Sequence, residues 1–151
     1  GLNYIGADIV KPMIASHNNQ YKDARTSFLH LDITQHDFPR ADLWICRDCF
    51  VHLSFEDTLS ALHKYMDSNI PYVLTSTSKN PGGYRNADID SGDIRELGGE
   101  IGIDLLSEPY SFPSDALFRI DDYFRGQPAS EMCLWSREQI GGAVKEFSKA
   151  I

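Results

Sequence analysis

The chain has 151 residues, 42% of them hydrophobic, so it can build one core and is too short to make two domains the expectation. Its 14 Lys and Arg are scattered among 22 Asp and Glu, giving a formal net charge of -8. A nucleic-acid partner is therefore disfavoured, because phosphate binding requires concentrated positive charge. No apolar run approaches a membrane span and no signal-peptide pattern opens the chain, so we expect a soluble, cytoplasmic protein without a membrane partner.

The first half of the chain predicts strands that alternate with helices or loops. Strands are expected at residues 3–10, 26–32, 43–46 and 70–75, and helices at residues 12–21 and 55–67. Pro12 fits a first helical turn, and Ser54 with Asp57 is a near capping box. Connections of this length are crossovers, so the sequence predicts an α/β fold with a parallel sheet, in which the 43–46 strand is buried on both faces.

The second half is less regular. Residues 86–99 are rich in Asp and Gly and predict a long loop, of the kind that often forms a lid. Strands are expected at residues 101–106 and 131–135. Ser136 is then expected to cap a helix that runs through Ala150, with Ile140, Val144 and Phe147 on one face.

The three cysteines do not predict a disulfide framework. Cys46 and Cys49 have the spacing of a redox or zinc half-site, but no second pair of ligands accompanies them. Cys46 ends a predicted buried strand, whereas a redox pair usually begins a helix. We therefore expect these to be small buried side chains and expect no metal site.

Polar residues gather directly after the 43–46 strand. Arg47, Asp48 and His52 follow it within six residues. In open α/β sheets, ligands bind in the crevice at the carboxyl ends of the strands. This stretch is the candidate site.

Four segments of the sequence, taken in order, resemble those of a known family. Asp8 in Tyr-Ile-Gly-Ala-Asp-Ile-Val, Asp32 in Phe-Leu-His-Leu-Asp-Ile, the stretch from Ala41 to Ser54, and Tyr-Val-Leu-Thr-Ser-Thr from Tyr72 resemble the second to fifth strands of a class I S-adenosylmethionine-dependent methyltransferase. The later residues 86–95 and 109–113 are similar to the tail of a bacterial subgroup. The resemblance covers most of the chain and implies a Rossmann-like, mostly parallel sheet with flanking helices, and S-adenosylmethionine as cofactor.

The resemblance also implies roles for five cofactor-binding residues. Asp8 matches the acid that accepts hydrogen bonds from the ribose hydroxyls, and Ile9 lies beside it. Asp32 matches the acid that faces the adenine amino group, and Ile33 is a candidate to pack on the ring. Arg47 belongs to the segment that lines the methionine end.

Asp48 and His52 are the implied catalytic residues. Methyl transfer is an in-line displacement, so positioning and water exclusion supply most of the catalysis. For a hydroxyl acceptor, a neutral His52 imidazole would remove the proton; the alternative is a helix-start residue that bonds to backbone. The acceptor is expected to be a small molecule or a glycan-like molecule. Aromatic side chains that would shape its pocket, or else simply cover the sheet, are Tyr84, Tyr110, Phe112, Phe118, Tyr123 and Phe124.

The sequence departs from the family at its start. It opens at the family's second strand and contains no glycine-rich turn. We expect residues 1–151 to form a single methyltransferase-like domain, truncated at its N-terminus, with an open slot that another segment or a partner chain fills. The alternatives are a catalytically silent Rossmann-like remnant that serves as an interaction module and a fragment of a nicotinamide-dependent oxidoreductase.

Overall fold

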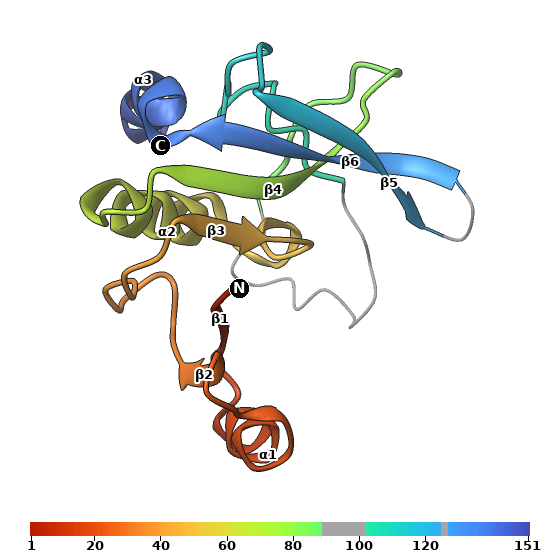
Figure 1. The fold of residues 1–151 in the computed structure, drawn as a ribbon. Helices are drawn as coiled ribbons and strands as arrows, with labels where there is room; N and C mark the ends of the chain where they lie inside the picture. The colour runs from red at the N-terminus through yellow and green to blue at the C-terminus, as the bar shows by residue number, and fades with distance from the viewer. Residues whose placement is uncertain (89–101, 125–126) are drawn as a thin grey trace.

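The computed structural model describes residues 1–88, 102–124 and 127–151 (Figure 1). Its elements follow one another as β1 (Tyr4–Asp8), α1 (Lys11–Tyr21), β2 (Thr26–His30), β3 (Leu43–Cys46), the 3-10 helix η1 (Phe50–His52), α2 (Phe55–Asp67), β4 (Tyr72–Ser78), β5 (Phe118–Phe124), β6 (Gln127–Ser136) and α3 (Arg137–Ala150). The predicted 43–46 strand and 55–67 helix have the predicted bounds. The strand expected at 70–75 is shifted to later residues.

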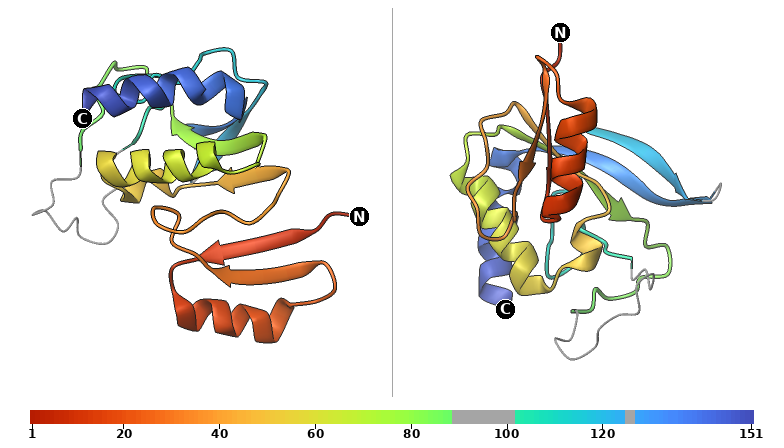
Figure 2. Two further views of the ribbon diagram at one scale, coloured as in Figure 1. Left: turned by 90° about the vertical axis from the view of Figure 1, so that its left-hand side faces the viewer. Right: turned by 90° about the horizontal axis from the view of Figure 1, so that it is seen from below.

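The strands form two sheets within the described residues. β1 and β2 pair in parallel, and the second sheet has the order β3-β4-β6-β5. β3 and β4 are parallel, whereas β6 is antiparallel to both of its neighbours. In Figure 2, left, β1 lies between β2 and β3, and all three point the same way. β1 and β3 therefore end at the same edge of the molecule, although they do not pair with each other.

The prediction that the 43–46 strand is buried on both faces is wrong. Cys46 is buried, but Leu43 and Ile45, on the other face, are 39% and 57% exposed. The reason is the placement of the helices. α2 and α3 pack on one face of the four-stranded sheet, and α1 packs on β1 and β2, apart from that sheet (Figure 1).

Both helices of the larger sheet begin as predicted. The Ser54 side chain accepts a hydrogen bond from the Asp57 N–H at 3.0 Å. At α3, Ser136 and Gln139 form a complete capping box. The core beneath these helices contains Leu62, Tyr65, Tyr110, Trp135 and Phe147.

The strand expected at 101–106 is not formed in its described part, residues 102–106. The apolar residues Ile103 and Leu105 alternate with polar ones in the sequence, but Asp104 between them is buried as well, so burial does not follow a strand pattern. The Leu105 N–H donates to the Thr77 hydroxyl at 2.9 Å rather than to a neighbouring backbone. The segment is therefore a loop whose apolar side chains are buried in the core beside β4.

The hairpin of β5 and β6 was not expected. β6 runs well beyond the predicted 131–135, and β5 had no predicted counterpart. Of the residues expected in a long loop at 86–99, only 86–88 lie in the described part; the expected lid lies outside it. Among the described residues, no helix is long and apolar enough to cross a bilayer.

Candidate functional site

Asp8 ends β1 at the edge where β3 also ends. Its Oδ1 accepts a hydrogen bond from the Val10 N–H at 2.7 Å, which holds the entry to α1. Within the described residues, no hydrogen bond reaches its Oδ2. Ile9, the next residue, is 60% exposed. The Asp8 carboxylate is thus fixed in place by one oxygen, and its predicted role toward the cofactor ribose stays a prediction.

Asp32 lies two residues beyond β2 in a tight turn. Its carboxylate accepts from the Thr34 hydroxyl at 2.7 Å and the Thr34 N–H at 2.9 Å, and these bonds lower the pKa of Asp32. Gln35 donates to the second oxygen at 3.0 Å. Ile33 packs against the hydrophobic core. The ionised Asp32 therefore organises its own turn, and the predicted roles of Asp32 and Ile33 toward adenine stay predictions.

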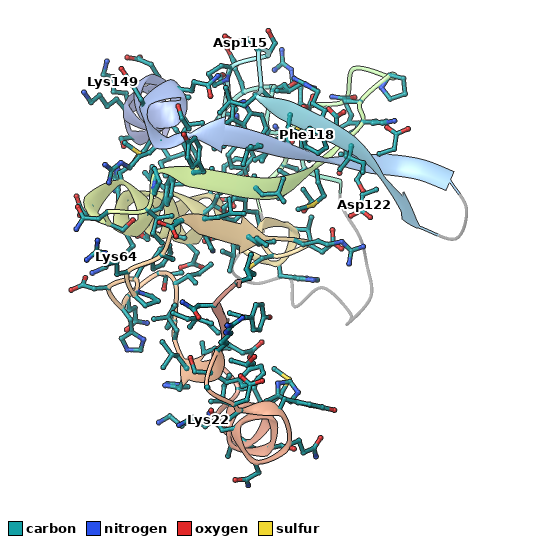
Figure 3. The ribbon with its side chains drawn as sticks, in the orientation of Figure 1. Lys22, Lys64, Asp115, Phe118, Asp122 and Lys149 are labelled. Atoms are coloured by element: carbon teal, nitrogen blue, oxygen red, sulfur yellow. The ribbon has the colours of Figure 1, made fainter. Side chains whose placement is uncertain are left out.

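Arg47 forms a two-point ion pair that the sequence did not predict. Its Nε lies 2.8 Å from Asp122 Oδ2, and its Nη2 lies 3.1 Å from Asp122 Oδ1. The hydrogen bond and charge of Asp122 raise the pKa of the Arg47 guanidinium. Figure 3 shows Asp122 on β5, between that strand and the end of β3. The pair ties the loop after β3 to the hairpin.

The backbone of Asp48 has a φ of 50°, a value that residues other than glycine rarely adopt. Its N–H donates to the Ser76 hydroxyl at 2.8 Å, so β4 holds this bend in place. The Asp48 side chain is 54% exposed and lies 3.7 Å from Arg47 Nη2. Residues in such conformations cluster at functional sites, which fits the predicted position of Asp48.

Cys49 lies in this loop, and its thiol is close enough to β1 to be affected by the charge of Asp8. The Asp8 carboxylate is close enough to oppose ionisation of the Cys49 thiol, although the hydrogen bond from Cys46 is stronger and the pKa of Cys49 is lowered overall. Of the sequence-predicted site residues, the structure thus brings Asp8 toward the Arg47–Asp48 loop, whereas Asp32 and Ile33 lie in a separate turn after β2.

His52 is the last residue of η1 and its side chain is exposed. Its backbone N–H donates to the Cys49 carbonyl at 3.0 Å. In the part of the chain that the structure describes, no hydrogen bond holds the imidazole. A catalytic role for His52 stays a prediction.

A groove of about 650 Å³ borders the start of α2. Phe55, Asn80, Tyr84, Arg85 and Asn86 are among the residues that line it. Tyr84 is the one predicted acceptor-pocket aromatic in this groove. The side chains of Tyr123 and Phe124 lie outside the described part.

The other predicted pocket aromatics lie elsewhere. Tyr110 and Phe112 are buried in the core, as the alternative interpretation holds, and Phe118 is 53% exposed on β5. Among the described residues, no three His, Cys, Asp or Glu side chains gather as metal ligands.

Sequence reasoning missed Ser76 and Asp122 as supports of the site, and Asp88, whose carboxylate accepts from the Phe55 N–H at the start of α2 at 2.7 Å. Asp122 is the third residue from the end of β5, and an acid at such a position carries no signal unless the strand itself is predicted. Asp122 could have been found only by predicting β5.

No family model matches the sequence, and no curated protein matches it either. Solved structures do. The chain superimposes on the N-methyltransferase NodS from Bradyrhizobium japonicum WM9, in complex with S-adenosyl-L-homocysteine, with a TM-score of 0.59 at 11% identity, over 89% of this chain and 66% of that one. Magnesium protoporphyrin IX methyltransferase from Synechocystis PCC 6803, with bound SAM, gives 0.55 at 17% identity, over 91% and 60%. Human N-acetylserotonin methyltransferase in complex with SAM gives 0.50 at 12%, over 89% and 39%.

These likenesses show the fold. The chain has the Rossmann-like α/β fold of class I methyltransferases, as the sequence resemblance implied. It spans 66%, 60% and 39% of the length of these three structures.

Proposed function

We propose that this chain is the greater part of an S-adenosylmethionine-dependent methyltransferase whose cofactor binds between the ends of β1 and β3. The observation that carries the proposal is the Asp8 carboxylate, which is fixed by the Val10 N–H and is close enough to Cys49 to affect the ionisation of its thiol. The similar folds named above were solved with SAM or its demethylated product. A carboxylate with one oxygen already held and one available suits a ribose diol.

The remaining roles follow from position. Ile9, exposed beside Asp8, would contact the sugar and base, and the turn at Asp32 and Ile33 would face the adenine. Arg47 would line the methionine end, where its guanidinium is oriented by Asp122. When bound, S-adenosylmethionine supplies an activated methyl group on a sulfonium.

The protein would hold the acceptor in line and exclude water. The exposed His52 would take a proton from a hydroxyl acceptor, and Asp48 would orient that acceptor. We propose a small-molecule or glycan-like acceptor, in a protein of the cytoplasm, with the groove around Tyr84 as its entry.

The proposal includes one more strand. β1 and β3 run the same way, and within residues 1–88, 102–124 and 127–151 no strand pairs with the edges that they present toward each other. Unpaired backbone in an apolar setting is costly. A strand from outside residues 1–151 would pair with both and complete the cofactor site.

Calorimetric titration with S-adenosylhomocysteine tests the proposal, with the chain alone and with a form extended before Gly1. Asp8→Ala in the form that binds should weaken affinity by about 1–3 kcal/mol, roughly 5- to 150-fold, because ribose hydroxyls lose their acceptor. Asp23→Ala is the matched control. That carboxylate also accepts backbone hydrogen bonds, from Arg25 and Thr26, but it lies before β2, at the opposite edge. Equal affinity in the Asp8 and Asp23 variants would remove Asp8 from the site. Binding by neither form would favour the silent remnant.

His52→Ala should lower kcat more than it weakens cofactor binding if the imidazole is the base. His63→Ala, an exposed histidine that interacts with Ser148 on α3, is its control. Turnover equal to that of the His63 variant would return His52 to a structural role.

A further inference from the structure

Cys46 and Cys49 form a thiol pair in the turn after β3. Cys46 ends the strand and is 4% exposed, whereas Cys49 is only partly buried. Between them the chain reverses at Asp48, with its φ of 50°. The two thiols are close enough for each to shift the pKa of the other.

The backbone around the pair is held on both sides. The Thr75 hydroxyl donates to the Cys46 carbonyl at 2.8 Å, and the His52 N–H donates to the Cys49 carbonyl at 3.0 Å. These two hydrogen bonds therefore hold the backbone of the turn that carries both thiols.

The two thiols differ in reactivity. Burial and the contact with Cys49 raise the pKa of Cys46, while the hydrogen bond from Cys46 lowers the pKa of Cys49. The thiolate is the reactive form of cysteine. Cys49, which has the lower pKa and the greater exposure, is the attacking thiol, and Cys46 is placed to resolve the product.

Cys133 provides an internal comparison. Thr75 pairs with Cys46 on one side and with Cys133 on the other, so Cys133 stands two strands away from Cys46. Two strand spacings are about 10 Å, beyond the roughly 7 Å between Cα atoms that a disulfide spans. Burial also raises the pKa of Cys133 to about 12. Cys133 can neither join the pair nor react readily.

We propose that Cys46 and Cys49 form a peroxide-sensitive dithiol, which closes to a disulfide inside the candidate cofactor site. The Cys49 thiolate attacks hydrogen peroxide, the O–O bond breaks, and the released hydroxide takes up the thiol proton as water. The Cys46 sulfur then attacks the sulfur of the Cys49 sulfenic acid. The S–S bond forms, the S–O bond breaks, and the hydroxyl leaves as water with the Cys46 proton. Two thiols are oxidised and one peroxide yields two waters.

The disulfide would restrict the conformation of the turn that carries Arg47 and Asp48. The thiol chemistry does not depend on the proposed methyl transfer, so the test reads the thiols directly.

The test treats the whole reduced chain with hydrogen peroxide, alkylates the remaining thiols and maps them by mass spectrometry. We expect a loss of about 2 Da, a Cys46–Cys49 crosslink within one chain, an alkylated Cys133 and reversal by dithiothreitol. Cys133→Ser should behave like the unsubstituted chain. Cys46→Ser should instead accumulate a Cys49 sulfenic acid that dimedone traps.

Three outcomes would overturn the proposal. The first is three alkylated thiols after peroxide treatment. The second is oxidation of Cys133 as fast as that of Cys49, and the third is a crosslink between two chains in place of one within the chain. Because these readouts require no cofactor or turnover, failure of the proposed methyltransferase function would leave the result interpretable.

Discussion

The ion pair of Arg47 and Asp122 gives a sharp test of how the candidate site is held. The guanidinium meets both carboxylate oxygens, and the two side chains differ in exposure, at 57% for Arg47 and 17% for Asp122. The perturbation is a double-mutant cycle with Arg47→Ala, Asp122→Ala and the double variant.

The exposures set the expected magnitudes. Removing Asp122 leaves a guanidinium that water can solvate, so Asp122→Ala should cost less than about 1 kcal/mol of unfolding free energy. Removing Arg47 leaves a mostly covered carboxylate without its two donors, so Arg47→Ala should cost about 1–2 kcal/mol. The coupling energy should be roughly 0.5–1 kcal/mol, the upper part of the range for exposed pairs, because the contact is bidentate.

Urea denaturation of the four proteins measures these energies. The control cycle is the pair of Glu146 and Lys149 on α3, at 69% and 70% exposure, where the coupling should be smaller. If Arg47→Ala destabilises no more than Asp122→Ala, or if the two cycles give equal coupling, the pair does not hold the loop after β3 against the hairpin.

Two further predictions concern stability. Ser136→Ala should cost about 1 kcal/mol in urea denaturation because the capping box with Gln139 is lost, and Ser136→Asp, which restores an acceptor, should recover most of it. Burial raises the pKa of Tyr110 to about 12, so between about pH 10 and pH 12 the unfolded chain has released a proton that the folded chain still binds, and stability should fall as the pH rises. Tyr110→Phe should reduce that fall; an equal pH dependence in both proteins would contradict the assignment.

The sequence determined the elements that local patterns specify. The apolar run at 43–46 and the helical spacing at 55–67 identify β3 and α2, because side-chain periodicity depends only on the chain itself. The caps at Ser54 and Ser136 are also local, since a hydroxyl reaches the N–H three residues on. The acids after β1 and β2, and the order of the motifs, were sufficient to predict the class of fold.

Burial was less well predicted. The sequence of an apolar strand does not show whether helices cover one face of the sheet or both. The exposure of Leu43 and Ile45 therefore depended on where the helices pack. Ile103 and Leu105 are both buried in the core, but their backbone bonds to Thr77, Ser78 and Phe112 instead of forming a strand ladder. Tyr110 was expected either to shape an acceptor pocket or to cover the sheet, and it lies in the core. The aromatic character of a side chain does not by itself distinguish a pocket position from a core position.

The contacts within the site were decided by tertiary structure alone. Arg47 and Asp122 are 75 residues apart, and their pairing required β5, a strand in which the adjacent Asp121 and Asp122 break the alternation that would predict it. Asp8 and Cys49 come near each other because β1 and β3 end at one edge, which follows from the arrangement of strands and not from either segment. Local sequence fixes the kind of side chain and its element, whereas distances between elements arise only when the chain packs, because they depend on every layer that lies between.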